Sequence, residues 1–179
     1  INLQISLRYT DRSDKPFIYT IYNSKKNKLA HLTRILSYMR PTNYTPEGLC
    51  FEAMYNQNQF IAGTSDLDSY FINFSDGQPC CSGYSGQDAG NHTKRWIDKL
   101  RTNLNMKVLS FYIHHKMLPA TATAEERAKG LTEMQDSFNH SSDGKLFRLM
   151  YGKDATAIDP TSVMEIAKSL NKTFMAAKA

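Results

Sequence analysis

The chain has 179 residues, of which 41% are hydrophobic and 22% are charged, and its formal net charge is +5. That length suits one compact domain, and the apolar fraction is too high for a disordered tail. The mean hydropathy is −0.50, and no apolar run approaches the roughly 20 residues that cross a bilayer. We therefore expect a globular protein with no membrane among its partners.

The charge is distributed unevenly. Residues 1–40 hold 8 Lys or Arg against 2 Asp or Glu, whereas residues 41–93 hold 6 acids and no Lys or Arg. Residues 94–118 hold 6 basic residues against 1 acid, and residues 119–179 balance at 8 and 8. The acid-only stretch favours a cation site and a protein partner over nucleic acid. Its six acids are Glu47, Glu52, Asp66, Asp68, Asp76 and Asp88.

Cysteine usage points to a reducing compartment. The chain has three cysteines, Cys50 and the adjacent pair Cys80–Cys81, and an odd count in a domain of this size is not a disulfide framework. A glycosylation sequon at Asn73 falls in a predicted buried strand, where a glycan cannot fit. We expect the protein in the cytoplasm or within a virion.

The first elements are a strand pair and a helix. Alternation of apolar and polar residues predicts strands over Leu3–Thr10 and Phe17–Tyr22. Apolar residues at helical spacing then predict a helix over 28–39. The short polar link between the two strands makes them an antiparallel hairpin.

A second helix and a buried strand follow. Thr45-Pro46-Glu47 predicts a helix start, with Thr45 as N-cap and proline at the first helical position, and Gly63 predicts its end. The apolar run Tyr70–Phe74 stops sharply at Ser75-Asp76-Gly77, which is typical of a central strand covered on both faces. A Gly-rich loop is predicted over 78–90.

The rest of the chain alternates between helices and strands. Thr123 and Glu126 form a capping box, which marks one of these helices at its start. The predicted elements are a helix over Trp96–Leu104, a strand over Lys107–Ile113, a helix through Leu131, Met134 and Phe138, a turn at Asp143-Gly144, an edge strand over Ala155–Ile158 and a last helix that starts at Asp159-Pro160 and uses Val163, Ile166, Ala167, Leu170 and Phe174.

This order predicts an α/β fold over residues 1–179: a three-layer α/β/α, Rossmann-like domain with a mostly parallel sheet and one antiparallel edge strand. Ligands of such sheets bind beyond the carboxyl ends of the central strands. Two predicted loops meet that description, the loop of Thr45 and the loop of Ser75, Asp76 and Gly77. Both lie in the acid-only stretch.

These residues resemble the von Willebrand factor A (VWA) domain family from its second strand onward. The most telling segments are T-P-E-G-L at Thr45–Leu49 and F-I-N-F-S-D-G-Q-P at Phe71–Pro79. The hairpin over 3–22, the K-V-L-S-F-Y-I strand and the terminal amphipathic helix complete the similarity, which covers essentially the whole chain. The resemblance implies the three-layer fold given above.

The resemblance also implies a metal-ion-dependent adhesion site. In the family this site combines a D-x-S-x-S motif, a Thr and an Asp, and here Thr45 and Asp76 match the latter two. The motif itself is absent, because the nearest string, Asp11–Lys15, lacks the second Ser and lies in a turn. We expect Mg²⁺ or Mn²⁺ to bind weakly or not at all to this chain alone, since a hydroxyl and one carboxylate are few ligands for a hard cation.

The first strand and first helix of the family are missing as well. We expect the domain to be truncated at its N-terminus, with those elements supplied by an upstream segment or another chain. The sequence does not say which.

The resemblance implies a protein-interaction module rather than an enzyme. Intracellular VWA proteins of bacteria and phages often work with AAA+ ATPases, so we expect such an ATPase or an assembly subunit as partner. No nucleophile elbow, P-loop or dinucleotide fingerprint occurs in the sequence. Two alternatives stay open: a structural subunit, for instance of a virion, with a dead metal site, and a Mg-dependent hydrolase or nucleotide-binding enzyme using Asp76 and Asp88.

Plainer interpretations compete at each candidate site. Thr45 can be an ordinary N-cap and Asp76 the first residue of a D-G turn. The Cys80–Cys81 pair is more often inert than redox-active, and His114–His115 beside a lysine suits an exposed strand edge.

Two groups of residues are interpreted as structural. The basic residues of the first helix region suit a solvated face better than an acidic partner; they are Lys25, Lys26, Lys28, Arg34 and Arg40. The strand aromatics are predicted to pack in the core and at strand edges; they are Tyr9, Phe17, Tyr19, Tyr22, Tyr70, Phe71, Phe74, Phe111 and Tyr112.

Overall fold

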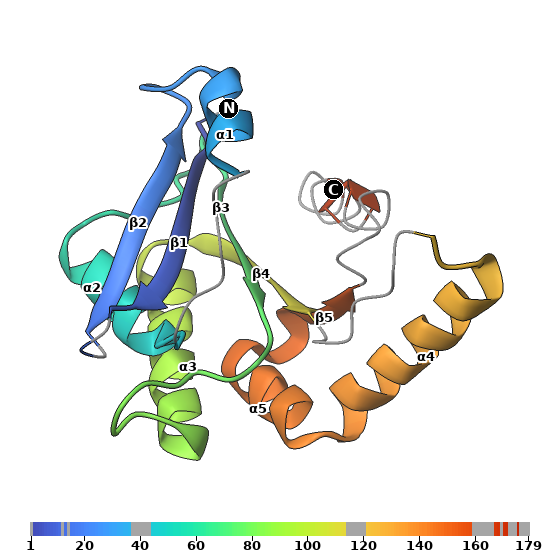
Figure 1. Cartoon of the computed structure of the whole chain (residues 1–179). Helices are drawn as coiled ribbons and strands as arrows, with labels where there is room; N and C mark the ends of the chain where they lie inside the picture. The colour runs from blue at the N-terminus through green and yellow to red at the C-terminus, as the bar shows by residue number, and fades with distance from the viewer. Residues whose placement is uncertain are drawn as a thin grey trace. The chain divides into compact units, whose positions relative to one another are not determined.

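The chain divides into two compact units in the computed structural model (Figure 1). The first comprises Ile1–Phe60 with Pro79–Trp96, and the second comprises Ile61–Gln78 with Ile97–Ala179. The structure describes residues 2–11, 13, 15–36, 44–113 and 121–158, and in the C-terminal segment residues 167, 168, 170, 171 and 175. That the whole chain forms one domain stays a prediction.

The first unit contains the predicted hairpin. Strands β1 (Gln4–Thr10) and β2 (Pro16–Asn23) pair antiparallel, with a β-bulge between Ile5 and Ser6. The turn between the strands is held by Asp11, whose Oδ1 accepts hydrogen bonds from the backbone N–H groups of Ser13 and Lys15 at 2.8 and 2.9 Å. These hydrogen bonds, led by the one from Lys15, lower the pKa of the Asp11 carboxyl. The prediction of an antiparallel pair is confirmed.

Two helices accompany the hairpin. Helix α1 (Leu29–Leu36) follows β2, as the helical spacing predicts, and the rest of that predicted helix lies outside the described residues. Helix α2 (Glu47–Asn56) packs against β2 and buries Cys50 and Phe51 completely. The first unit therefore contains a two-stranded sheet whose strand β2 contacts both of these helices.

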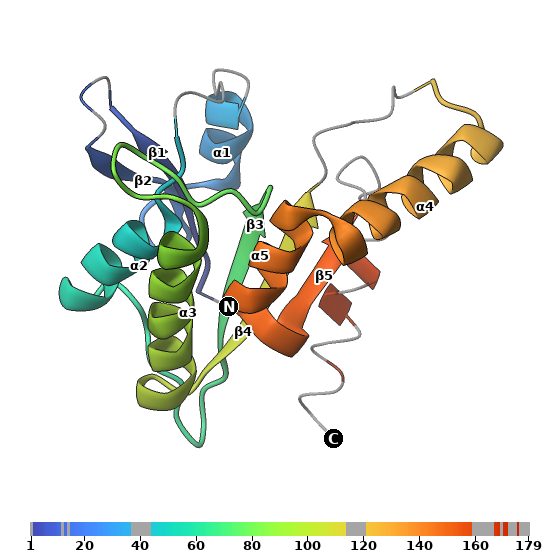
Figure 2. The ribbon, with the colours of Figure 1, turned by 90° about the horizontal axis from the view of Figure 1, so that it is seen from below.

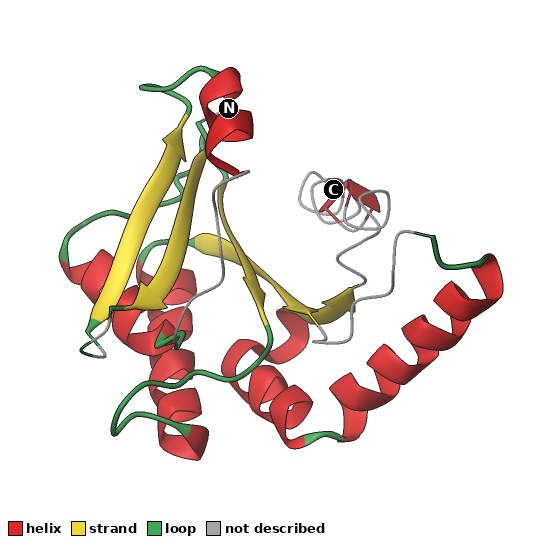
Figure 3. Cartoon of the chain, in the orientation of Figure 1, coloured by secondary structure: helices red, strands yellow, loops and turns green. Residues whose placement is uncertain are grey.

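The second unit contains a parallel sheet. Strands β3 (Ser69–Ser75), β4 (Met106–Ile113) and β5 (Ala155–Ile158) lie in the order β3-β4-β5, and both pairings are parallel (Figure 3). The α/β fold class is confirmed. Among the described residues, however, the antiparallel strands form a sheet of their own, and β4 rather than β3 is the central strand of the parallel sheet.

Helices connect the parallel strands. Helix α3 (Gly86–Asn103) joins β3 to β4, and α4 (Ala124–His140) with α5 (Ser142–Tyr151) joins β4 to β5 through a 3₁₀ turn, Gly152–Asp154. Both α4 and α5 contact β5, and α5 also contacts β4; Figure 2 shows α5 beside the sheet. No helix in the described part of the chain is long and apolar enough to cross a membrane.

Helix α4 begins as its capping box predicts. The Thr123 hydroxyl accepts the N–H of Glu126, and the Glu126 carboxylate accepts the N–H of Thr123. The hydrogen bonds from Thr123 lower the pKa of the Glu126 carboxyl. Met134 and Phe138 are buried on this helix, in agreement with the predicted apolar face.

Three element boundaries differ from the prediction. Helix α2 ends at Asn56 and not at Gly63, because Asn58 adopts the left-handed conformation (φ 54°) that stops a helix. Helix α3 begins at Gly86, inside the predicted loop. The predicted turn at Asp143-Gly144 is instead the first turn of α5, whose N-cap Ser141 accepts the N–H of Gly144 at 3.0 Å.

Aromatic rings fill the core of the second unit. The ring of Phe147 lies 4.7 Å from that of Tyr151 and 5.4 Å from that of Tyr112, between centroids. Asn73 on β3 is buried as predicted, and its Nδ2 donates to the Tyr151 hydroxyl at 2.8 Å. This hydrogen bond ties the sheet to α5 across the core.

Replacing Tyr151 by Phe removes that acceptor without changing the shape of the core. We expect Tyr151→Phe to lower the free energy of unfolding by about 1–3 kcal/mol, because a buried amide loses a partner. Chemical denaturation measures the change. The matched control Tyr19→Phe removes an exposed hydroxyl and should change stability by less than about 0.5 kcal/mol; equal effects of the two variants would contradict the prediction.

Candidate functional site

The turn after β3 holds the predicted Asp76. The Ser75 hydroxyl accepts the backbone N–H of Gly77 at 3.1 Å, and Asp76 Oδ1 accepts the N–H of Gln78, also at 3.1 Å. Gln78 in turn donates from its side-chain Nε2 to Asp143 Oδ2 at 2.8 Å. The side chains of Ser75 and Asp76 therefore fix the backbone where the parallel strand ends, and Gln78 links the turn to Asp143.

Gly77 makes this turn possible. Its φ is +82°, a conformation that L side chains rarely adopt. A Cβ at this position would also lie 2.8 Å from the Asp143 backbone oxygen and 3.1 Å from the Tyr112 ring. Glycine is required at position 77 both because of its positive φ and because there is no room for a Cβ.

Asp76 is exposed at this turn. Its Oδ1 accepts the backbone N–H two residues further on, as aspartates in turns do. This confirms the interpretation of Asp76 as the first residue of a D-G turn. That hydrogen bond also orients the carboxylate, and among the described residues Oδ2 has no hydrogen-bond partner. A carboxylate held in this way can accept a ligand without losing its role in the turn.

Thr45 lies in the first unit, whereas Asp76 lies in the second. The prediction that Thr45 is the N-cap of α2 is wrong: the cap is Pro46 (φ −79°, ψ 71°), and no side chain makes a cap hydrogen bond. The Thr45 carbonyl instead accepts the N–H of Glu47 at 3.0 Å and that of Cys80 at 3.2 Å. These backbone hydrogen bonds, rather than its hydroxyl, are what fix Thr45.

A magnesium ion takes six oxygen ligands in near-octahedral geometry. Within the described residues no group of three or more His, Cys, Asp or Glu side chains is arranged to hold a metal ion. Thr45 and Asp76 supply one hydroxyl and one carboxylate. These two groups alone do not fit a resident magnesium ion, so no chemical step is assigned to a metal here.

Half of the acids in the acid-only stretch have partners that the sequence did not reveal. Glu47 is fully buried and accepts a hydrogen bond from Arg8 at 3.0 Å. Asp68 pairs with Lys107 at 2.7 Å, and this contact raises the pKa of the lysine. Glu52 lies 3.2 Å from His92 Nε2. Arg8 and Lys107, which are distant in sequence from this stretch, therefore neutralise two of its six carboxylates.

A polar cluster in the first unit was not predicted. The Tyr84 hydroxyl lies 3.1 Å from His92 Nδ1, and Trp96 Nε1 donates to His92 Nε2 at 2.9 Å. Burial raises the pKa of Tyr84, so the phenol stays protonated at neutral pH. The i, i+4 spacing of His92 and Trp96 on one helix was the one sequence signal that could have indicated this cluster.

The cluster borders a hollow of about 540 Å³. The hollow is lined by Leu49, Gly83, Tyr84, Ser85, Asp88, Ala89 and His92. Gly48 lets α2 approach the cluster, since a Cβ there would lie 2.3 Å from the Tyr84 hydroxyl oxygen and 2.9 Å from the Thr93 backbone nitrogen. The T-P-E-G-L glycine thus has a packing role within the first unit.

The three cysteines differ in burial. Cys50 is buried, and burial raises the pKa of its thiol to about 11, so it stays protonated near neutral pH. Cys80 and Cys81 are half-buried, and the backbone N–H of Cys80 donates to the Thr45 carbonyl. The His114–His115 pair and most of the predicted last helix lie outside the described residues.

No protein family, curated protein or solved structure matches the chain. The resemblance to VWA domains consequently rests on the sequence segments quoted above.

Gly77→Ala tests whether the turn after β3 is built as described. We expect a loss of about 2–4 kcal/mol in stability, because the Cβ meets backbone and ring atoms in addition to the strain of a positive φ. The control is Gly83→Ala, which has a positive φ of 70° but no atom within 4 Å of the new Cβ and should cost about 1 kcal/mol. Thermal and chemical unfolding measure both; equal losses would mean that the contacts of Gly77 do not matter.

Proposed function

We propose that the chain is a protein-interaction module of the VWA type, which binds a protein partner through the loops around Thr45 and Asp76. The observation that carries this proposal is the exposed carboxylate of Asp76, oriented at the carboxyl end of β3 by the hydrogen bond from Gln78. Parallel sheets place their ligand sites at this end of the strands.

The surroundings of Asp76 suit binding better than catalysis. Its neighbours Ser75 and Gln78 are engaged in the turn or with Asp143, so neither is poised as a nucleophile or base. An oriented carboxylate can accept two parallel hydrogen bonds from an arginine of a partner protein. Such binding requires a carboxylate held in a fixed orientation, and it does not require a nucleophile or a base beside it.

The nature of the partner follows from the resemblance. VWA proteins of bacteria and phages often act with AAA+ ATPases, so we propose such an ATPase or an assembly subunit as the partner, in the cytoplasm or within a virion. A divalent cation would assist only if further oxygen ligands join the Asp76 carboxylate. The resemblance assigns those ligands to the absent D-x-S-x-S motif.

Substitution of Asp76 tests the binding surface. We expect Asp76→Ala to weaken capture of the partner from an extract of the source organism at least about tenfold, because an oriented charged contact is lost. Asp66→Ala is the matched control, since Asp66 is also an exposed acid and lies in the loop that precedes the same strand. Quantitative affinity purification compares the two. If Asp76→Ala retains every partner, the loops do not bind and a passive structural role gains support.

Cation titration tests the metal contribution separately. For the chain alone we expect Mg²⁺ or Mn²⁺ to shift the unfolding temperature by less than about 1 °C, because two ligands give too little binding energy to stabilise the fold. For the protein expressed together with any sequence that precedes residue 1 in its gene, we expect a larger shift that Asp76→Ala removes. Scanning calorimetry measures both. No shift in either protein would contradict the adhesion-site assignment.

A further inference from the structure

The two faces of the β1–β2 hairpin differ in what covers them. Alternate residues of a strand point to opposite faces. On one face Arg8 donates to the buried Glu47 at 3.0 Å, and its guanidinium lies 5.1 Å from the centre of the Phe51 ring. That face therefore packs on helix α2.

The opposite face carries the cross-strand pairs Leu7–Tyr19 and Tyr9–Phe17. The rings of Tyr9 and Phe17 stack, with centroids 5.7 Å apart. We call these four residues the aromatic face. Phe17 is 48% exposed and Tyr19 is 54% exposed, so of the two predicted places, the core and the strand edges, neither ring lies in the core.

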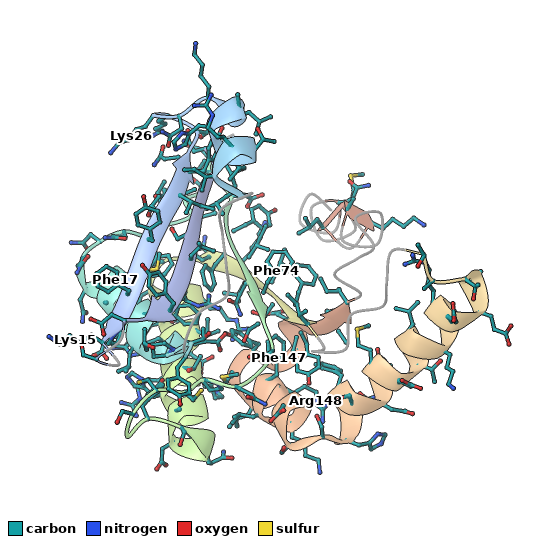
Figure 4. All side chains as sticks on the ribbon, viewed as in Figure 1. Lys15, Phe17, Lys26, Phe74, Phe147 and Arg148 are labelled. Carbon is teal, nitrogen blue, oxygen red and sulfur yellow. The ribbon has the colours of Figure 1, made fainter. Side chains whose placement is uncertain are left out.

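Basic residues surround the aromatic face. Residues 15–36 contain five Lys or Arg and no Asp or Glu. Lys15 stands before β2, and Lys25 and Lys26 follow it, all three exposed. Figure 4 shows Phe17 along the hairpin, with Lys15 toward one end and Lys26 at the other.

We propose that the aromatic face of the hairpin binds an acidic amphipathic helix of a partner protein, whose apolar stripe covers Phe17 and Tyr19 and whose flanking carboxylates meet Lys15, Lys25 and Lys26. The surface lies in the first unit and does not depend on Asp76.

An amphipathic helix is the occupant that the exposed rings and the nearby lysines favour. A two-stranded sheet is stabilised by packing against helices, and within the first unit both α1 and α2 contact β2. Helix α2 covers one face, and the exposed aromatic side chains of the other resemble the grooves that take the apolar side of an amphipathic helix. The margin carries Lys15, Lys25 and Lys26 against Asp11 in the turn beside Lys15, and this excess of positive charge selects an acidic helix by charge complementarity.

Nucleic acid and lipid fit the same surface less well. Bases stack on free ring faces, whereas Tyr9 and Phe17 use a face of each ring on one another. Insertion into a bilayer needs apolar side chains that protrude beyond the lysines. Here the rings lie along the strands, between lysines at both ends of the hairpin.

The test uses a fluorescent synthetic helical peptide of about 18 residues, roughly five turns, with a leucine stripe flanked by glutamates. Fluorescence anisotropy measures its affinity for the whole chain. We expect binding that weakens at least about tenfold in Phe17→Thr/Tyr19→Thr, and that also weakens in Lys25→Glu/Lys26→Glu and at high salt. Threonine preserves β-propensity, so the hairpin keeps its fold, and circular dichroism checks this.

Matched controls separate the surface from general effects. Ile61→Thr/Leu67→Thr replaces two equally exposed apolar residues of the second unit, and Lys129→Glu/Lys145→Glu makes the same charge change on exposed helix positions. Both should bind the peptide like the unsubstituted chain.

Several outcomes would overturn the proposal. One is the absence of measurable binding of the acidic peptide at about 100 µM, and another is equal binding of a peptide with the same leucine stripe flanked by lysines. Equal weakening by the control pairs would show that the contact is nonspecific. Tighter binding of phosphatidylserine vesicles or a single-stranded oligonucleotide, lost in Phe17→Thr/Tyr19→Thr, would assign the face to that other ligand class.

Discussion

The first unit depends on one buried ion pair. Glu47 is completely shielded from water, and its carboxylate is held by Arg8 of β1 at 3.0 Å. A charge buried in this way is costly unless it is paired, and removal of one partner typically costs about 3–5 kcal/mol. The pair fixes α2 against one face of the hairpin. It thereby decides which side of the sheet belongs to the core and which side is left to solvent.

The turn after β3 shows how binding geometry and folding share the same residues. Gly77 fits only because it lacks a Cβ, and the bonds around it orient Asp76. In the first unit Gly48 has a similar role, since it admits the Tyr84 hydroxyl and the backbone of α3. Both glycines belong to the segments that carry the VWA resemblance. Each is explained by the space around it.

Local patterns in the sequence were sufficient for most elements. Strand alternation predicted β1 and β2, and the Thr123–Glu126 capping box predicted the start of α4, because each signal acts within a few residues. The end of α2, the start of α3 and all of α5 were missed. For α5 the pair Asp143-Gly144 usually marks a turn, but the Ser141 side chain caps a helix there instead.

Long-range pairings were beyond the reach of such patterns. Nothing in the sequence links Arg8 to Glu47, 39 positions away, or Asn73 to Tyr151, 78 positions away. The candidate site likewise has one part that local sequence predicts and one part that it does not. Its turn at Asp76 could be read from Ser75-Asp76-Gly77, whereas the cluster of Tyr84, His92 and Trp96 requires the fold to bring a loop and a helix together.

The β-bulge between Ile5 and Ser6 separates a buried end of the hairpin from an end with exposed side chains. Beyond the bulge, the consecutive residues Ile21 and Tyr22 are both buried, which regular alternation forbids. Before it, Phe17 and Tyr19 face solvent. The extra residue thus changes the phase of the strand only beyond the bulge, because the pairs Leu7–Tyr19 and Tyr9–Phe17 lie between the bulge and the turn. A deletion at the bulge would therefore alter the buried end of the hairpin and leave the exposed rings in place.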